Sequence, residues 1–333
     1  MEYKVLYRKY RPRNFEELVG QDNVKEILVN SIKLGKIAHA YIFTGPRGTG
    51  KTSTAKIFAK TLNCLNNSSG ISCDECEMCK TYNESADIIE IDAASNNGVE
   101  EIRTLRDSVK IAPYNSKYKI YIIDEVHMLT KEAFNALLKT LEEPPAHAMF
   151  LLLAERAEAF LPTILSRVVT MKIRPLPEET VAEYLMQTGL SEEESHILAA
   201  YAQGRIGQAL ELVEDEAFRE MRQDILGKLE ALPSMQEGEA YLLAKELEVY
   251  KNDLRFLDIM ELWYRDLLTA KSLREERYLI QKDKKDAIFR GAKEPAETLA
   301  KKAGAVRTAR MRLAQNANFR LTLEVMLMDL KEN

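Results

Sequence analysis

The chain has 333 residues, of which 46% are hydrophobic and 30% charged; this is typical of a globular protein and excludes a largely disordered one. Its length favours roughly two or three domains. Lysine and arginine total 47 against 52 for aspartate and glutamate, a formal charge of -5. This balance argues against a protein coated all over in nucleic acid, but it is compatible with a local basic surface.

The sequence gives no sign of membrane insertion or secretion. No run of about 18 apolar residues occurs. The first eight residues, from Met1 to Arg8, carry too many charges for a secretory signal. We therefore expect a cytoplasmic protein with no membrane partner.

Short apolar runs alternate with longer amphipathic segments in the first half of the chain. We predict buried strands at 40–43, 119–123 and 149–153, and a less apolar strand at 88–92. Apolar runs that are bounded by turn residues and separated by helices are typical of parallel strands. The expected fold class is therefore α/β, a parallel sheet with helices on both faces.

Apolar residues at helical spacing predict a helix over 131–143, ended by Pro144. They are Phe134, Leu137, Leu138 and Leu141. After Pro175 the sequence is almost wholly helical in character, with a softer boundary near 214–218. We therefore expect domains at 1–175, 176–216 and 217–333.

The segment from Gly45 to Thr52 fits the phosphate-loop pattern G-x-x-x-x-G-K-[ST] in full, between a predicted strand and an amphipathic helix at 53–62. Its glycines let backbone N–H groups face phosphate oxygens, and the helix N-terminus adds a favourable dipole. Lys51 would reach the β- and γ-phosphates of ATP, and the Thr52 hydroxyl would ligate Mg²⁺. The alternative is a glycine-rich turn without a ligand, which the order of strand, loop and helix disfavours. The expected nucleotide-binding residues are Gly45, Pro46, Arg47, Gly48, Thr49, Gly50, Lys51, Thr52 and Ser53.

Two adjacent acids, Asp124 and Glu125, follow the predicted strand at 119–123. Asp124 would hold Mg²⁺, and Glu125 would orient the attacking water, because phosphoryl transfer relies on positioning and charge stabilisation. Alone, such a pair is more often a solvated strand end. With a phosphate loop upstream, it predicts the catalytic half of an ATPase site in which Lys51, Asp124 and Glu125 act together.

All four cysteines of the chain lie in one short stretch, spaced Cys-x8-Cys-x2-Cys-x2-Cys. In a reducing compartment this clustering indicates a metal site rather than disulfides. Four thiolates suit tetrahedral Zn²⁺, and a closed four-sulfur site is structural rather than catalytic. An iron–sulfur cluster and unliganded thiols are the alternatives. The expected ligands are Cys64, Cys73, Cys76 and Cys79.

The first 150 residues resemble the gamma/tau subunit of the bacterial DNA polymerase III clamp loader, an AAA+ ATPase. Besides the phosphate loop and the cysteine insertion, the resemblance is carried by residues 7–12, 19–21, 91–98, 124–128 and 135–145. Residues 161–167 fit both clamp-loader ATPase branches. The later part of the chain looks more like the delta-prime subunit, at residues 201–210, 263–268 and 316–324.

Both resemblances imply one machine, a hetero-oligomeric ring of clamp-loader subunits around primed DNA that acts on the sliding clamp. They imply an AAA+ nucleotide-binding domain, a helical lid at 176–216 and a helical collar at 217–333. Arg11 and Val19 fall where the family packs adenine. Arg167 falls where the family presents an arginine finger to ATP on a neighbouring subunit, worth about 10³ to 10⁵ in rate. Without the resemblance, Arg167 would be taken for a surface arginine.

Several positions depart from the family pattern. Glu155 and Arg156 replace a Thr-Thr pair that senses the γ-phosphate, and Gly207 replaces the second sensor arginine. Arg205 is near in sequence, but two positions along a helix would put it on a different face. Val168 replaces a cysteine. The sequence therefore supports ATP binding and leaves hydrolysis at this chain's own site open.

The departures favour an alternative function, a delta-prime-like stator with a weak or silent ATP site that donates Arg167. A third class, a hexameric branch-migration or initiator ATPase, is disfavoured by the cysteine insertion and the helical tail. For DNA contact, the candidate is residues 96–98 with a helix at 101–110. The helix carries Arg103, Arg106 and Lys110, which suit phosphate contacts. A solvated charged helix face explains these residues almost as well.

Overall fold

The computed structural model describes residues 11–96, 98–157, 160 and 162–331. The chain divides into two compact units. The first ends at Tyr184 and is completed by Gln203–Leu210, and the second comprises Leu185–Ala202 and the residues from Glu211 onward. The division into three domains at 175 and 216 stays a prediction.

The first unit is built on a five-stranded parallel sheet with strand order β2-β3-β4-β1-β5. The strands are β1 (Ala40–Thr44), β2 (Ile88–Asp92), β3 (Lys119–Asp124), β4 (Ala148–Ala154) and β5 (Val169–Lys172). The first four confirm the predicted strands. The sequence did not predict β5, because among its four residues only Met171 is buried and no apolar run marks it. It pairs with β1 at the edge of the sheet.

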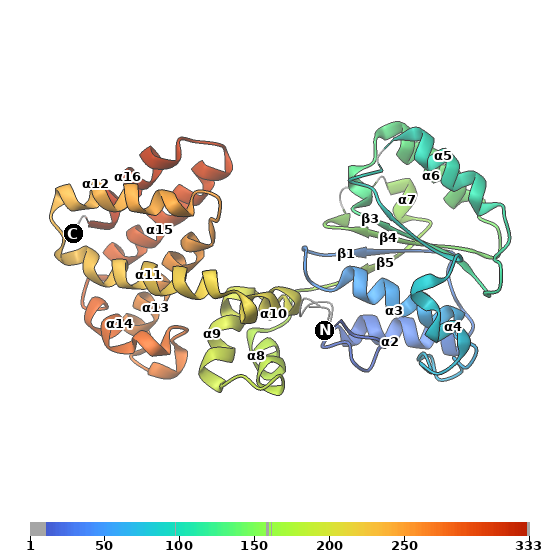
Figure 1. Ribbon diagram of the computed structural model, residues 1–333, viewed down its shortest axis with the longest axis horizontal. Coiled ribbons are helices and arrows are strands. Elements are labelled where there is room, and N and C mark those ends of the chain that lie inside the picture. The colour runs from blue at the N-terminus through green and yellow to red at the C-terminus, as the bar shows by residue number, and fades with distance from the viewer. Residues whose placement is uncertain (1–10, 97, 158–159, 161, 332–333) are drawn as a thin grey trace. The chain divides into compact units, whose positions relative to one another are not determined.

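Helices cover both faces of this sheet, as predicted (Figure 1). On one face lie α2 (Asp22–Lys33) and α3 (Lys51–Asn63), and on the other α5 (Val99–Val109) and α6 (Lys131–Glu142). Two shorter helices are α4 (Glu77–Lys80) and α7 (Pro162–Leu165).

Each face of the sheet has its own hydrophobic core. Tyr41 and Phe43 of β1 pack with Phe58 of α3, whereas Ile42 between them packs in the opposite cluster with Leu137 of α6. Successive side chains of a strand point to opposite faces, so a strand covered on both sides is apolar throughout. This explains why every residue of β1 and β4 is buried.

The second unit is helical throughout its described residues, as expected. Its helices are α9 (Glu192–Ala202), α11 (Glu216–Ala231), α12 (Glu237–Glu246), α13 (Arg255–Leu273), α14 (Lys285–Gly291), α15 (Ala296–Ala314) and α16 (Phe319–Lys331). Two further helices, α8 (Glu178–Gln187) and α10 (Ile206–Glu214), start in the first unit and end in the second. Within the part of the chain that the structure describes, no helix has both the length and the apolar character to cross a membrane.

Asp87 fixes the loop that leads into β3. The backbone N–H groups of Tyr114, Asn115 and Ser116 donate to its carboxylate at 2.7, 3.2 and 3.1 Å. Burial alone would raise the pKa of this carboxyl, but the N–H donors outweigh burial and hold its pKa below the ordinary value. The charged form of Asp87 therefore stabilises the fold.

We expect Asp87→Ala to lower the stability of the first unit by about 1–3 kcal/mol, because three donors lose a buried acceptor. Hydrogen exchange measured by mass spectrometry should accelerate at residues 114–116 and in β3. Trp263, the single tryptophan, lies in the second unit, so its fluorescence reports the other unit and should not change. Unaltered exchange at 114–116 would contradict this role.

The same carboxyl predicts a pH dependence. Because the pKa of Asp87 is depressed in the folded chain, its contribution is fully present above the unfolded value of about 3.9. The contribution disappears as pH falls through the folded pKa. In acid, the wild type should therefore lose the stability difference that separates it from Asp87→Ala.

Candidate nucleotide-binding and metal sites

The predicted site residues gather at one edge of the sheet. The register pairs Thr44 of β1 with Ala154 of β4, and Asp92 of β2 with Asp124 of β3. Since all five strands are parallel, their carboxyl ends lie along this edge, where ligands bind in open α/β sheets. The phosphate loop, the acidic pair and Glu155 each follow one of these strand ends.

The phosphate loop turns between β1 and α3 with three glycines at positive φ. Gly45, Gly48 and Gly50 have φ values of 153°, 80° and 97°, a region that costs glycine little. A Cβ on Gly45 would lie 2.1 Å from the carbonyl oxygen of Ile173, so no side chain fits there. The Gly45 N–H donates to the Ala154 carbonyl at 3.2 Å. The glycines of the pattern are therefore required by the geometry of the turn.

Lys51 is held inside this loop. Its side chain is buried, and Nζ donates to the carbonyl oxygens of Gly45 at 2.7 Å and Pro46 at 3.1 Å. Burial lowers the pKa of Lys51, although Glu125, Asp124 and Glu155 act to raise it. An anion in the loop would give this ammonium a stronger, charge-assisted partner than two carbonyls.

The acidic pair faces the start of α3. The Thr52 hydroxyl donates to Asp124 Oδ2 at 3.0 Å, and the Glu125 N–H donates to Asp124 Oδ1 at 2.9 Å. These two bonds orient the carboxylate of Asp124. Hydroxyl and carboxylate oxygens are the ligands that Mg²⁺ prefers, so Thr52 and Asp124 fit the predicted magnesium site.

The side chain of Glu125 has hydrogen-bonding capacity that the described residues leave unused. Its φ is 48°, in the left-handed region. Its Oε2 is buried and, among the described residues, has no hydrogen-bond partner. His127 Nδ1 lies 3.5 Å from that oxygen. A buried carboxylate oxygen without a partner is costly unless a water or ligand completes it, which suits the predicted role in holding a water molecule.

The structure also brings part of the expected adenine side to the loop. Arg11 Nε donates to the Ser53 hydroxyl at 3.2 Å. Val19 is half-buried. Two residues later, the side chain of Gln21 donates to the Arg174 carbonyl at 2.6 Å and accepts from the Arg174 backbone N–H at 3.2 Å. Arg47 is exposed. Residues 7–10, which carry part of the resemblance, lie outside the described residues.

Sequence reasoning missed the position of Arg205. A Cβ on Gly48 would lie 3.5 Å from Arg205 Cδ, so this arginine packs along the phosphate loop. The argument from helix faces does not apply, because α10 begins one residue later at Ile206. Gln203 and Gly204 have φ values of 51° and 78° and end α9. The pair Gln203-Gly204 is typical of a helix C-terminus, and it could have shown from the sequence that Arg205 lies between two helices.

Arg167 lies away from this chain's own loop. It follows α7, where Nη1 donates to the Thr163 carbonyl at 2.6 Å and Nη2 lies 3.3 Å from Glu142 Oε1. Its side chain is 40% exposed. None of the polar contacts found among the described residues joins it to the phosphate loop. This placement is compatible with the predicted role in trans.

The three candidate DNA-binding cations, on α5 and just after its end, are each paired with an acid of this helix. Arg103 lies 2.5 Å from Glu100, and Arg106 and Lys110 lie 3.2 and 3.3 Å from Asp107. Asn97 falls outside the described residues. The pairing favours a solvated helix face, and DNA contact at α5 stays a prediction.

The four cysteines form a compact sulfur cluster. Their Sγ atoms all lie within 4.8 Å of one another, with Cys64 3.5 Å from Cys73 and 3.9 Å from Cys76. A tetrahedral zinc with Zn–S bonds of about 2.3 Å separates its sulfurs by about 3.8 Å, so the cluster fits such an ion.

Local surroundings shift the pKa values of three of these thiols in different directions. Backbone N–H groups of Glu75 and Cys76 lower the pKa of Cys73 to about 6, whereas burial raises the pKa of Cys64 and Cys79. Four neighbouring thiolates repel one another, and a bound cation would offset this repulsion. The cluster therefore has the chemistry of a metal site rather than of four independent thiols.

Comparison with known proteins finds that both parts of the chain are similar to DNA polymerase III subunits. Residues 20–177 match the family model described as DNA polymerase III, delta subunit, and residues 216–332 match the model of its C-terminal part. The DNA polymerase III subunit tau of Bacillus subtilis is 39% identical over 327 residues, which cover 90% of this chain and 58% of that protein. The tau subunit of Escherichia coli is 43% identical over 222 residues, covering 64% and 34%. The chain thus spans 58% or less of these two relatives.

The Bacillus subtilis alignment runs through both halves of the chain. The alternative of a delta-prime-like stator is therefore not favoured. Among solved structures, Thermotoga maritima RuvB is 16% identical with a TM-score of 0.46, covering 85% of this chain and 90% of that one. A gamma subunit-related protein from the same organism is 18% identical with a TM-score of 0.45, covering 93% and 98%. At this distance neither bears on function.

We expect the purified chain to carry one metal ion that depends on all four sulfurs. Cys76→Ser should lose it, measured by elemental analysis and by release to a chromogenic chelator after thiol modification. Wild type should release the ion as pH is lowered, because thiolate ligands must be deprotonated to bind it. The exposed Ser68→Ala in the same module is the control. Full metal content in Cys76→Ser would contradict a four-sulfur site.

Proposed function

We propose that this chain, which belongs to the AAA+ clamp-loader subunits of DNA polymerase III, binds and hydrolyses ATP to help open the sliding clamp and load it on primed DNA. It would act in the cytoplasm, in a hetero-oligomeric ring with other loader subunits. The observation that carries the proposal is the meeting of the loop and the acids at one sheet edge, where Thr52 bonds Asp124 at 3.0 Å.

Each residue of this edge has a distinct task. The loop N–H groups and Lys51 bind the phosphates, and Thr52 and Asp124 hold Mg²⁺, which supplies neutralisation of phosphate charge. Glu125 orients the attacking water through its buried Oε2, for which the described residues offer no hydrogen-bond partner. Arg11 and Val19 take the adenine side. These roles need little covalent chemistry from the protein, because positioning and electrostatics carry phosphoryl transfer.

We also propose that the chain hydrolyses ATP at its own site, although two positions there depart from the family pattern. Glu155 places a carboxylate near Lys51, which weakens the attraction for phosphate, and Gly207 offers no cation. The methylene carbons of Arg205 pack against Gly48, and its guanidinium donates to Gln203 Oε1 at 3.1 Å. This places a cationic side chain next to the loop, and we infer that its charge offsets both departures. We therefore infer an active rather than a silent site.

We further propose that Arg167 acts on ATP bound by a neighbouring subunit, and that the four cysteines bind Zn²⁺. Arg167 is exposed and makes no described contact with its own loop, which supports a role in trans. The zinc would be structural, since four sulfurs leave no open position for a substrate.

Binding and hydrolysis at the site can be separated by two substitutions. Lys51→Ala should weaken ATP binding at least about tenfold, because the phosphates lose their buried cation. Glu125→Gln should bind ATP as the wild type does and slow single-turnover hydrolysis in the assembled complex by about 10²-fold. Lys56→Ala on the same helix, where Lys56 pairs with Glu90, is the control. Equal hydrolysis by the wild type and Glu125→Gln would mean a silent site.

For Arg167→Ala, we expect turnover of the assembled complex to fall by about 10³ to 10⁵ at the neighbouring site. The ATP affinity of the isolated chain should stay the same. Arg167→Lys keeps the charge but not the planar fork, so it should recover only part of the rate. A loss of affinity in the isolated chain would place Arg167 at its own site and overturn the role in trans.

A further inference from the structure

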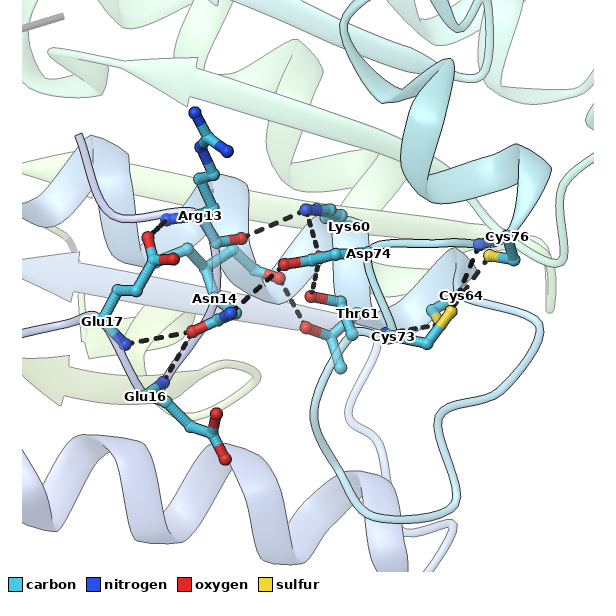
Figure 2. Close-up of polar contacts among 12 residues, drawn as sticks. Arg13, Asn14, Glu16, Glu17, Lys60, Thr61, Cys64, Cys73, Asp74 and Cys76 are labelled. Carbon is cyan, nitrogen blue, oxygen red and sulfur yellow. Dashed lines mark hydrogen bonds and ion pairs between the residues drawn. The ribbon is translucent and has the colours of Figure 1, made fainter. Parts of the chain in front are cut away.

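The cysteine module is tied to the N-terminal segment that carries Arg11. Figure 2 shows Lys60 and Asp74 lying between the turn at Asn14 and the cysteines. Lys60 Nζ lies 2.5 Å from Asp74 Oδ1 and donates to the Arg13 carbonyl at 3.3 Å. Asn14 Nδ2 donates to Asp74 Oδ2 at 3.2 Å. Asp74 therefore holds the N-terminal segment through two adjacent residues.

The module in turn fixes Asp74. It follows Cys73 directly, with φ 58°, a conformation that aspartate tolerates better than most residues. The Ser72 hydroxyl, on the other side of Cys73, donates to Asp74 Oδ1 at 2.8 Å. The direction of the Asp74 carboxylate thus depends on how the cysteine loop is folded.

The N-terminal segment forms a closed turn around Asn14. Its Oδ1 accepts the N–H groups of Glu16 and Glu17, both at 3.0 Å, and Glu17 Oε2 accepts the Arg13 N–H at 2.8 Å. Pro12 fixes its own φ and restricts the residue before it. The path from Asn14 back to Arg11 is therefore short and stiff, and a shift of the turn moves Arg11.

At the other end of this segment, Arg11 contacts α3, the helix that follows the phosphate loop. Its Nε donates to the hydroxyl of Ser53, the residue after Thr52. Ser53 and Lys60 are seven residues apart on α3, which is about two helical turns, so they share one face. That face of α3 holds the N-terminal segment at both ends. The Lys60 side chain is 12% exposed and that of Asp74 34%, so solvent screens this ion pair less than a surface pair.

We propose that Asp74 is a positioning residue for the nucleotide site. Held by the four-cysteine module, it acts through Lys60 and Asn14 to keep Arg11 against Ser53, on the nucleoside side of the bound nucleotide. Loss of the metal or of the Asp74 charge then weakens ATP binding without touching the phosphate-binding residues. The inference rests on the proposed ATP site and adds the cysteine module to it.

The test compares ATP with inorganic triphosphate as ligands of the full chain. Asp74→Asn keeps the shape of the side chain and removes the charge that pairs with Lys60. It should raise the Kd for ATP about three- to tenfold and leave the Kd for triphosphate unchanged. Arg11→Ala should give the same selective loss, and the double variant should lose no more than Arg11→Ala alone. Glu75→Gln makes the same charge change one residue away and is the matched control.

Metal content is measured in every variant. If Asp74→Asn loses the ion, Lys60→Met removes the same link from outside the module and is compared instead. Wild-type ATP affinity in a metal-replete Asp74→Asn or Lys60→Met overturns the inference, as does additivity of Asp74→Asn with Arg11→Ala or an equal loss for triphosphate. A wild-type chain that binds neither ligand contradicts the proposed function itself.

Discussion

The parallel register of β1, β3 and β4 is the constraint on which the rest of the first unit depends. It brings the ends of these strands to one edge, so that the loop after Thr44 and the acids after Ile123 can share a ligand. The register is stable because both faces of the sheet are covered, and a slip of one residue would turn Tyr41 and Phe43 away from α3. Apolar packing on the two faces of the sheet therefore stabilises the geometry of the site at its edge. The hydrogen bond from Thr52 to Asp124 then joins the start of α3 to the end of β3.

Two opposing effects act on the pKa of Lys51 at this edge: burial lowers it and nearby acids raise it. Lys51 is nearly fully buried, which favours its neutral form, while Glu125, Asp124 and Glu155 favour its charged form. Burial has the larger effect in the chain without nucleotide. A phosphate ligand would reverse this balance, because an anion next to a poorly solvated ammonium stabilises the charged form strongly.

The sequence predicted what depends on local pattern and missed what depends on tertiary placement. Continuous apolar runs identified β1, β3 and β4. The spacing of the loop and of the cysteines predicted groups of residues that the structure brings together. The strand β5 has no such run, since it pairs at the edge and buries only Met171. Arg205 was set aside by a helix-face argument that fails because the helix starts after it. The link from Asp74 to Asn14 spans 60 residues, and no local signal announces it.

Glu155 and Arg205 are far apart in the sequence, but both change the charge around the phosphate loop. Glu155 adds an acid near Lys51, and Arg205 adds a cation beside Gly48. A loop that lost neutral or cationic groups at two sensor positions without compensation would bind triphosphate weakly, since each added repulsion acts in a poorly solvated site. The packing of Arg205 against Gly48 would supply positive charge from a different chain position. The charges around the loop can therefore stay balanced while the residues that supply them change, which is compatible with the proposed binding of phosphate at this loop.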